Sequence, residues 1–465
     1  MSEELAFKSA LELGVLIKNK IISPLELTQL YLDRIERLDG QLGSFVSVAA
    51  ESALTHARNK TEELASAIDT DDLPPFFGIP IGVKDLNAVA GMPITYGVAA
   101  LKGNIAQYDE AIVTKLKAAG CIILGKTATS QLGSFPYTEC PGFLPTRNPW
   151  HTDYTAGGSS GGSASAVAAG LCAIAQGSDG GGSIRTPANC CGLVGIKPAR
   201  GRVSYAPVGE YQSGISSNGI LARTVADAAA LLDVISGYVT GDPYWLPNPP
   251  ILFSEATTLN PHSLKIGFTT SLSPFGRSSQ WSPVEKIVGQ IQDMGHTVKE
   301  IELEVEPLIE PFKRIWQAGA AAAGIPLELL SPLNQWLAAR SGTAGEYLRA
   351  TQQMHVISRG IVAMFQEIDV LLLPVLMKPP IRVAQWENLS PEETVANIIE
   401  WIAPCPLANA SGLPAIALPV GFDGQGLPTG IQLVGKPGDE ITLIALATVL
   451  ESLNPFDRIP PRFVE

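Results

Sequence analysis

The chain has 465 residues, and its 46% hydrophobic and 17% charged content is enough to bury a large core. A formal net charge of −13 without a long basic run argues against nucleic-acid and anionic-membrane partners. The composition agrees with a soluble enzyme whose partner is a small molecule, uncharged or weakly cationic.

The cysteines and the N-terminus bear on location. Six cysteines show neither zinc-finger spacing nor a Cys-x-x-Cys pair, so we expect free core thiols in a reducing compartment. The first residues, Met1 to Leu5, are acidic and lack the basic start and apolar run of a signal peptide. No stretch reaches the roughly 18 apolar residues that span a bilayer. These features predict a cytoplasmic protein.

Helices and short apolar strands are expected to alternate along the chain. Ser-Pro-x-Glu sequences supply a cap, a first-turn proline and a reciprocal glutamate, and predict helices that begin at Ser23, Ser282 and Ser390. Short apolar runs predict buried strands at 121–124, 171–176, 264–268, 370–373 and 415–420. Strands interleaved with helices indicate an α/β sheet covered on both faces.

An isolated lysine, Lys84, lies in the mostly apolar segment 78–86. A lone lysine in a strand is usually a solvated edge residue. Alternation would instead send Lys84 to the face opposite Val83, where burial would disfavour the ammonium. To act as a base near neutral pH, it needs its pKa to fall by several units from about 10.4.

Two glycine-rich segments with serines follow, Gly157–Gly162 and Gly177–Arg185. Glycine lets backbone N–H groups approach a ligand closely, and a run of such groups beside a serine hydroxyl can stabilise an oxyanion. Ser183 ends such a run. The serines could also be turn residues only. A nucleophilic serine needs a base, which is usually histidine. None of the chain's five histidines lies in a comparable context, so lysine is the remaining candidate. The histidines are His56, His151, His262, His296 and His355.

These segments resemble the amidase signature hydrolases, which cleave amide bonds with a Ser–Ser–Lys triad. Gly78–Asp85 matches the family's lysine motif, Gly157–Gly162 its first serine motif and Gly177–Arg185 its nucleophile loop. In the family a fixed interval separates the two serines, and the 24 residues from Ser159 to Ser183 fit it, which selects Ser159 over Ser160. Further family-like sequence occurs at 191–198, 412–416 and 432–435, so the resemblance covers roughly residues 5 to 455.

The resemblance implies one amidase signature domain over residues 1–465, with a large mixed β-sheet core covered by helices on both faces. Residues 1–66 would form an N-terminal helical region and 67–235 the catalytic core. Residues 236–465 would complete the core and carry the variable pocket segments. Small residues at 163–170 predict an interior helix that starts just after Ser159, and the strand at 171–176 would then lead back to Ser183.

The resemblance also implies roles for individual residues. Ser183 would attack the substrate carbonyl, Ser159 would pass the proton on after a cis peptide bond, and neutral Lys84 would accept it. Acylated Ser183 would then be hydrolysed, with no metal and no cofactor. The supporting groups would be an oxyanion hole from the N–H groups of Gly180, Gly181, Gly182 and Ser183, the hydrogen-bonding neighbour Ser160, and the loop-bracing pair Asp179 and Arg185.

Specificity in this family depends on variable segments. Candidate pocket residues are Tyr137, Trp316, Trp401 and Ile402, although a core role is equally open for each. Gly180 replaces a threonine or isoleucine that is common in the family. The resulting Asp-Gly-Gly-Gly-Ser form resembles subgroups that act on aryl or aliphatic amides, including hydrolases of 6-aminohexanoate cyclic dimers.

Two other motifs match poorly in context. Residues 120–127 fit the phosphate-loop pattern, but Cys-Ile-Ile-Leu between the glycines reads as a strand and not as an open loop. Residues 158–162 fit the nucleophile elbow of α/β-hydrolases, which must follow a buried strand, whereas 151–156 reads as a polar loop. The elbow would also need a base such as His262, His296 or His355.

The main functional alternative is the glutaminase component of the tRNA-dependent amidotransferase. That subgroup commonly has glutamine after Ser-Ile-Arg, whereas this chain has Thr186. A catalytically inactive binding scaffold is disfavoured, because every triad position is intact. The oligomeric state is open, with a homodimer among the alternatives.

Overall fold

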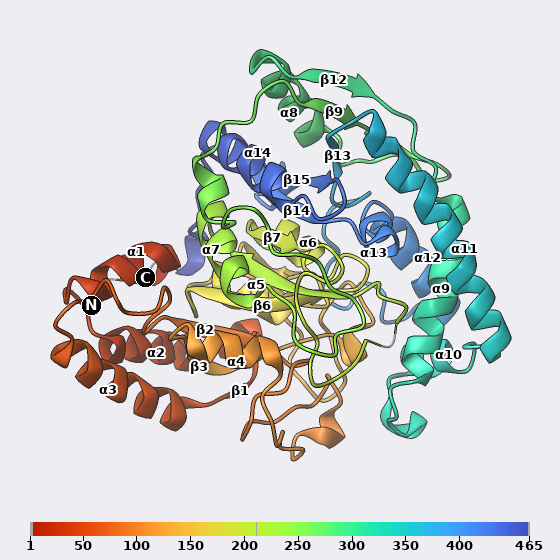
Figure 1. Cartoon of the computed structure of the whole chain (residues 1–465). Helices are drawn as coiled ribbons and strands as arrows, with labels where there is room; N and C mark the ends of the chain where they lie inside the picture. Colours follow the sequence, from red (N-terminus) through yellow and green to blue (C-terminus); the bar gives the residue numbers. More distant parts are fainter. Residues whose placement is uncertain (1–2, 211, 464–465) are drawn as a thin grey trace.

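The computed structural model describes residues 3–210 and 212–463, which form a large mixed sheet surrounded by helices (Figure 1). Strands β2, β3 and β6 pair in parallel, as do β9, β12 and β13, and the other neighbours pair antiparallel. The predicted α/β fold with a mixed sheet is confirmed. The sheet order in this part of the chain is β1 (Phe45–Val48), β3 (Ile122–Thr127), β2 (Pro80–Lys84), β6 (Ile174–Asp179), β8 (Ser217–Ala222), β7 (Val194–Lys197), β14 (Ala415–Phe422), β15 (Pro428–Gly435), β13 (Val370–Pro374), β9 (Lys265–Phe268) and β12 (Thr297–Glu300).

Helices cover both faces of the sheet. Helix α5 packs on β2 and β6, α7 on β8, and α14 on β14 and β15, while α9 packs against α10 and α11 beside the sheet (Figure 1). The helices are α1 (Ala10–Lys18), α2 (Pro24–Leu42), α3 (Ala50–Ser66), α4 (Ala111–Ala118), α5 (Gly161–Ala168), α6 (Arg185–Cys191), α7 (Val225–Ile235), α8 (Ser282–Asp293), α9 (Glu306–Ala321), α10 (Pro332–Ala338), α11 (Ala344–Ala363), α12 (Pro391–Trp401), α13 (Pro406–Ser411) and α14 (Glu440–Leu453).

Two of the three predicted helix caps form as expected. At α2 the Ser23 hydroxyl accepts from the Glu26 amide at 3.1 Å, and the Glu26 carboxylate accepts from the Ser23 amide at 2.8 Å. Ser390 caps α12 in the same way. Ser282 differs: α8 begins with Ser282 itself after Trp281 in a helical conformation, and its described cap makes no side-chain hydrogen bond. Ser282 therefore lies inside the first turn, where its hydroxyl is not positioned as a cap.

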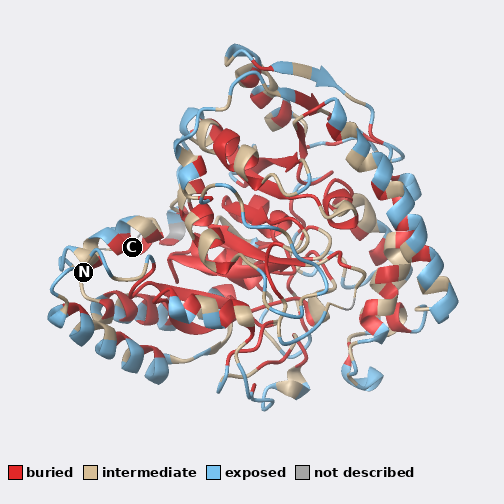
Figure 2. Cartoon of the chain, in the orientation of Figure 1, coloured by how far each residue is buried: buried red, intermediate tan, exposed pale blue. Residues whose placement is uncertain are grey.

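Buried residues concentrate in the strands and the helices against them (Figure 2). All eight residues of α5 are buried, because its glycine, alanine and serine side chains let it lie close to β2 and β6. All six cysteines are free and buried, as predicted. Within the described residues, no helix combines the length and apolarity that a membrane crossing needs.

Two segments bear on the alternative motifs. Residues 122–127 form the buried strand β3, and Lys126 in it lies 3.0 Å from the Asp85 carboxylate, so no open phosphate loop exists there. Residues 151–155 were expected as a polar loop but form β5 (His151–Thr155), paired with β4 (Arg147–Asn148) in a hairpin apart from the main sheet. A second small pair is β10 (Ser271–Leu272) with β11 (Gly276–Arg277).

Candidate active site

Lys84 is the last residue of β2, and its side chain is fully buried. Its Nζ atom lies 2.7 Å from Oγ of Ser159, 2.8 Å from Oγ of Ser160 and 3.0 Å from Oγ of Ser178. Ser178 comes from β6, which pairs with β2, and the other two serines come from the turn before α5. Three hydroxyl groups from two chain segments therefore surround one amine.

Burial lowers the pKa of Lys84 to about 7, and the negative charge of Asp179 opposes this shift only in part. An exposed lysine is almost wholly protonated at neutral pH. A substantial share of Lys84 is therefore a neutral amine there, which meets the pKa condition for a base.

Hydrogen bonds join the turn before α5, which lies in the first glycine-rich segment, to the second glycine-rich segment. The peptide bond between Gly158 and Ser159 is cis. The amide of Ser160 donates to the carbonyl oxygen of Ser183 at 3.1 Å. The hydroxyl of Ser160 donates to the carbonyl oxygen of Ser178 at 3.1 Å while its oxygen accepts from Lys84. Ser160 thus bonds to both segments as well as to the amine.

Ser183 ends the loop that follows β6, and it is only partly buried, whereas Ser159 is 1% exposed. The amide of Gly182 donates to the Asp179 carboxylate at 2.7 Å, which occupies one of the four predicted oxyanion donors. In the described residues the amides of Gly180, Gly181 and Ser183 have no protein acceptor. Three donors therefore remain beside the Ser183 hydroxyl.

A buried ion pair braces this loop. Arg185 lies 2.9 Å from the Asp179 carboxylate and also donates to the side chains of Asn409 and Gln432 and to the carbonyl oxygen of Cys405. Burial opposes ionised Asp179, but the charge of Arg185 holds the pKa of this carboxyl well below its usual value. The pair links the Ser183 loop to the C-terminal part of the sheet.

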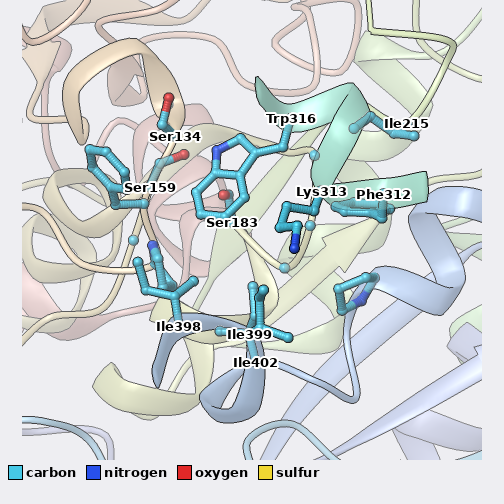
Figure 3. Close-up of a pocket in the computed structure, with 18 of the residues that line it drawn as sticks. Ser134, Ser159, Ser183, Ile215, Phe312, Lys313, Trp316, Ile398, Ile399 and Ile402 are labelled. Atoms are coloured by element: carbon cyan, nitrogen blue, oxygen red, sulfur yellow. The ribbon is translucent and has the colours of Figure 1, made fainter. Parts of the chain in front are cut away.

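Ser159 and Ser183 line the same cavity of about 160 Å³ (Figure 3). On this measure one water needs about 10–15 Å³, so the cavity has room for an organic molecule. None of the hydrogen bonds of the described residues joins the two hydroxyls directly. No histidine is among the cavity's described lining residues, so the base of a nucleophile elbow is missing there.

Two helices supply much of the cavity's apolar wall. Helix α12 and the residue after it contribute Ile398, Ile399 and Ile402. Helix α9 contributes residues spaced one or three positions apart, hence from one face: Leu308, Ile309, Phe312, Lys313 and Trp316. Of the four pocket candidates, Trp316 and Ile402 lie on the cavity. Four further lining residues were not predicted from sequence, because their helical spacing alone would equally fit a core-facing helix: Phe312, Lys313, Ile398 and Ile399.

Tyr137 and Trp401 do not line the cavity. Tyr137 stacks behind Phe135, with ring centroids 5.8 Å apart, and Phe135 takes the place on the wall. Trp401 is 1% exposed, and its indole N–H donates to the carbonyl oxygens of Lys378 and Pro379. At 3.6 residues per turn, Trp401 lies about 160° around α12 from Ile399, so these two side chains point to opposite sides of the helix.

Residues 26–444 match the family model described as Amidase. A protein from Synechocystis sp. named "Putative amidase" is 59% identical, covering 95% of this chain and 88% of that protein. A second relative, the "Putative amidase AmiB2" of Mycobacterium tuberculosis, is 35% identical, covering 97% of each chain. The chain therefore belongs to the amidase family.

Solved structures of two amide hydrolases are also similar to this chain over nearly its whole length. The structure of 6-aminohexanoate cyclic dimer hydrolase complexed with substrate superposes with a TM-score of 0.90 at 27% identity, covering 99% of this chain and 100% of that one. A bacterial aryl acylamidase of the amidase signature enzymes gives 0.88 at 26% identity, covering 98% of each chain. The protein is a hydrolase that acts on amide C–N bonds.

Proposed function

We propose that the protein hydrolyses amides through an acyl-enzyme on Ser183, with Ser159 as the bridging serine and Lys84 as the base. The observation that carries this proposal is the 2.7 Å contact between Nζ of buried Lys84 and Oγ of Ser159, which lines the same cavity as Ser183. A serine hydroxyl needs such an adjacent base to become an effective nucleophile.

The hydrogen-bond directions favour Ser159 over Ser160 as the bridge. A neutral amine has two N–H donors and one lone pair. The hydroxyl of Ser160 lies in position to donate to the carbonyl oxygen of Ser178, and its oxygen then accepts from Lys84. The hydroxyl of Ser159 can donate to the lone pair instead, and its oxygen is then ready to accept a proton from Ser183.

The proposed reaction has two halves. As Ser183 attacks the carbonyl carbon, its proton passes to Ser159 and the Ser159 proton passes to Lys84. The amides of Gly180, Gly181 and Ser183 would hold the developing oxyanion. The relay then returns the proton to the leaving nitrogen, the C–N bond breaks, and water hydrolyses the ester on Ser183.

The cavity supports a substrate with an apolar body. Its apolar lining comes mainly from isoleucine, phenylalanine and tryptophan side chains, and Ser183 and Gly180–Gly182 also line it. We therefore propose aryl, aliphatic or cyclic amides as the substrate class, as for the aryl acylamidase and the cyclic dimer hydrolase named above. Glutaminase activity within a tRNA-dependent amidotransferase is the alternative. A cytoplasmic location and a homodimer remain predictions.

A panel of amides tests this function. The purified chain should hydrolyse apolar amides alone and prefer them to free glutamine, and Ser183→Ala should lower turnover by several orders of magnitude. Ser159→Ala should keep a weak residual rate, because the nucleophile and the oxyanion donors remain. An enzyme inert on the panel that became an efficient glutaminase with the other amidotransferase components would favour the alternative.

A further inference from the structure

The cavity has a single charged side chain among its described lining residues, Lys313. It lies on the face of α9 that also carries Ile309, Phe312 and Trp316. Figure 3 shows its side chain reaching from α9 toward the centre of the pocket. An ammonium group beside apolar side chains is stabilised by an anionic partner.

The partner of Lys313 in the structure is Glu310, three residues earlier on the same helix. The Glu310 side chain is 75% exposed, whereas that of Lys313 is 26% exposed. Ion pairs open to water contribute little, since solvent screens the attraction and the side chains lose freedom. Glu310 is therefore a weak counter-ion that a better-shielded carboxylate can replace.

The indole N–H of Trp316 is a second indication of a ligand with acceptor atoms. The atom is buried, and it has no hydrogen-bond acceptor among the described residues. A buried donor without an acceptor is unfavourable until a ligand or water supplies one. One face of α9 thus brings to the cavity wall the cation of Lys313 and the indole of Trp316, whose buried N–H lacks an acceptor among the described residues.

We propose that Lys313 selects amides whose end remote from the scissile bond carries a carboxylate, which takes the place of Glu310. This inference rests on the proposed function only for the position of the scissile amide. The carboxylate would lie among apolar side chains, where a charge-assisted hydrogen bond is stronger than in water. A substrate with a carboxylate differs from the uncharged or weakly cationic partner expected above. That expectation came from the net charge of the chain and not from the cavity.

Binding can be measured without turnover in the Ser183→Ala protein, which keeps Lys313 and the cavity. The ligands are ω-carboxyalkanamides of graded chain length, each matched to the unsubstituted alkanamide, and ω-acetamidoalkanoates, each matched to an N-alkylacetamide. Calorimetry should show at least one anionic ligand binding roughly tenfold or more tighter than its neutral match. Adding Lys313→Gln should remove that preference and leave the neutral ligands nearly unaffected.

Two further variants sharpen the test. Glu310→Gln should tighten binding of the anionic ligand by up to about fivefold, because the competing carboxylate is gone. It should have no such effect when Lys313 is already glutamine. Lys378→Gln is the matched control, since Lys378 pairs with Glu400 and is not among the cavity residues. The proposal is overturned if no anionic ligand outbinds its neutral match, or if Lys313→Gln leaves the preference intact. Failure of the triad would appear instead as full turnover in Ser183→Ala.

Discussion

Arg185 contacts both carboxylate oxygens of Asp179, with Nε 2.9 Å from Oδ2 and Nη2 2.9 Å from Oδ1. Both side chains are fully buried. The same carboxylate accepts from the amides of Gly182 and Ile184, on either side of Ser183. The Asp179 carboxylate, held by Arg185, therefore fixes the backbone on both sides of Ser183.

Asp179→Asn should destabilise the fold, because it leaves Arg185 buried without its counter-ion, at a cost of about 3–5 kcal/mol. The folded pKa of Asp179 lies below its unfolded value of about 3.9, so the pair stabilises the fold fully above that pH. Urea unfolding at neutral pH should show the loss, and the difference from wild type should shrink on acidification below about pH 4. Asp153→Asn, in the exposed pair with Arg382, should have almost no effect.

The pH dependence of kcat/KM should report Lys84. Since the neutral amine is the proposed base, kcat/KM should rise with pH through about 7 and then level off. Lys84→Met should lower the rate strongly and abolish this transition. A pH–rate profile of each protein, with a substrate that does not titrate in the range, provides the measurement.

Lys197 offers a matched control for that assignment. Burial, with the nearby charge of Arg185, also lowers the pKa of Lys197 to about 7, but its Nζ donates to the carbonyl oxygen of Pro198 and not to a serine. Lys197→Met should keep the kinetic transition near pH 7. If the transition vanished in this variant and survived in Lys84→Met, the base would have to be reassigned.

Two glycines of the oxyanion loop should differ sharply in tolerance. Gly182 has φ +121°, and an added Cβ would lie 2.8 Å from Cβ of Cys405, so Gly182→Ala should move the loop and lower kcat roughly a hundredfold. An added Cβ at Gly180 would meet nothing closer than 3.9 Å. Gly180→Ala should therefore be tolerated, while Gly180→Thr should narrow the cavity and penalise bulky acyl groups most. Equal kcat losses in the two alanine variants would contradict this account.

The cavity wall predicts which aromatic residues control substrate choice. Trp316→Ala should lower kcat/KM for bulky apolar amides more than for small ones, because it removes a large side chain from the wall. Tyr137→Phe should leave that preference unchanged, since Tyr137 lies behind Phe135. A panel of amides graded by acyl size would test the pair, and a changed preference in Tyr137→Phe would count against the assigned wall.

The parts predicted from sequence are those in which local pattern and interior packing agree. The apolar segment around Lys84 favoured a buried strand, and the small residues after Ser159 favoured a closely packed helix, and the structure has both. The cap at Ser282 was not, because Trp281 adopts a helical conformation that the Ser-Pro-x-Glu pattern does not reveal.

The cavity wall depends on contacts between segments far apart in the chain. Helices α9 and α12 meet the Ser183 loop from more than a hundred residues away, and each has apolar residues on the cavity and others buried away from it. Which face turns to the cavity depends on the neighbouring elements, as Trp401 and Ile402 show by lying side by side in sequence and on different faces. Lys313 had no sequence signal that separated it from a solvated lysine.

Covalent labelling tests the central claim most directly. The protein should be treated with a serine-directed phosphonate, digested, and analysed by mass spectrometry to locate the adduct. The proposed mechanism predicts one adduct on the peptide that contains Ser183, formed more slowly in Lys84→Met and absent in Ser183→Ala. An adduct on Ser159 or Ser160 in the wild-type protein, or undiminished labelling of Ser183→Ala, would contradict it.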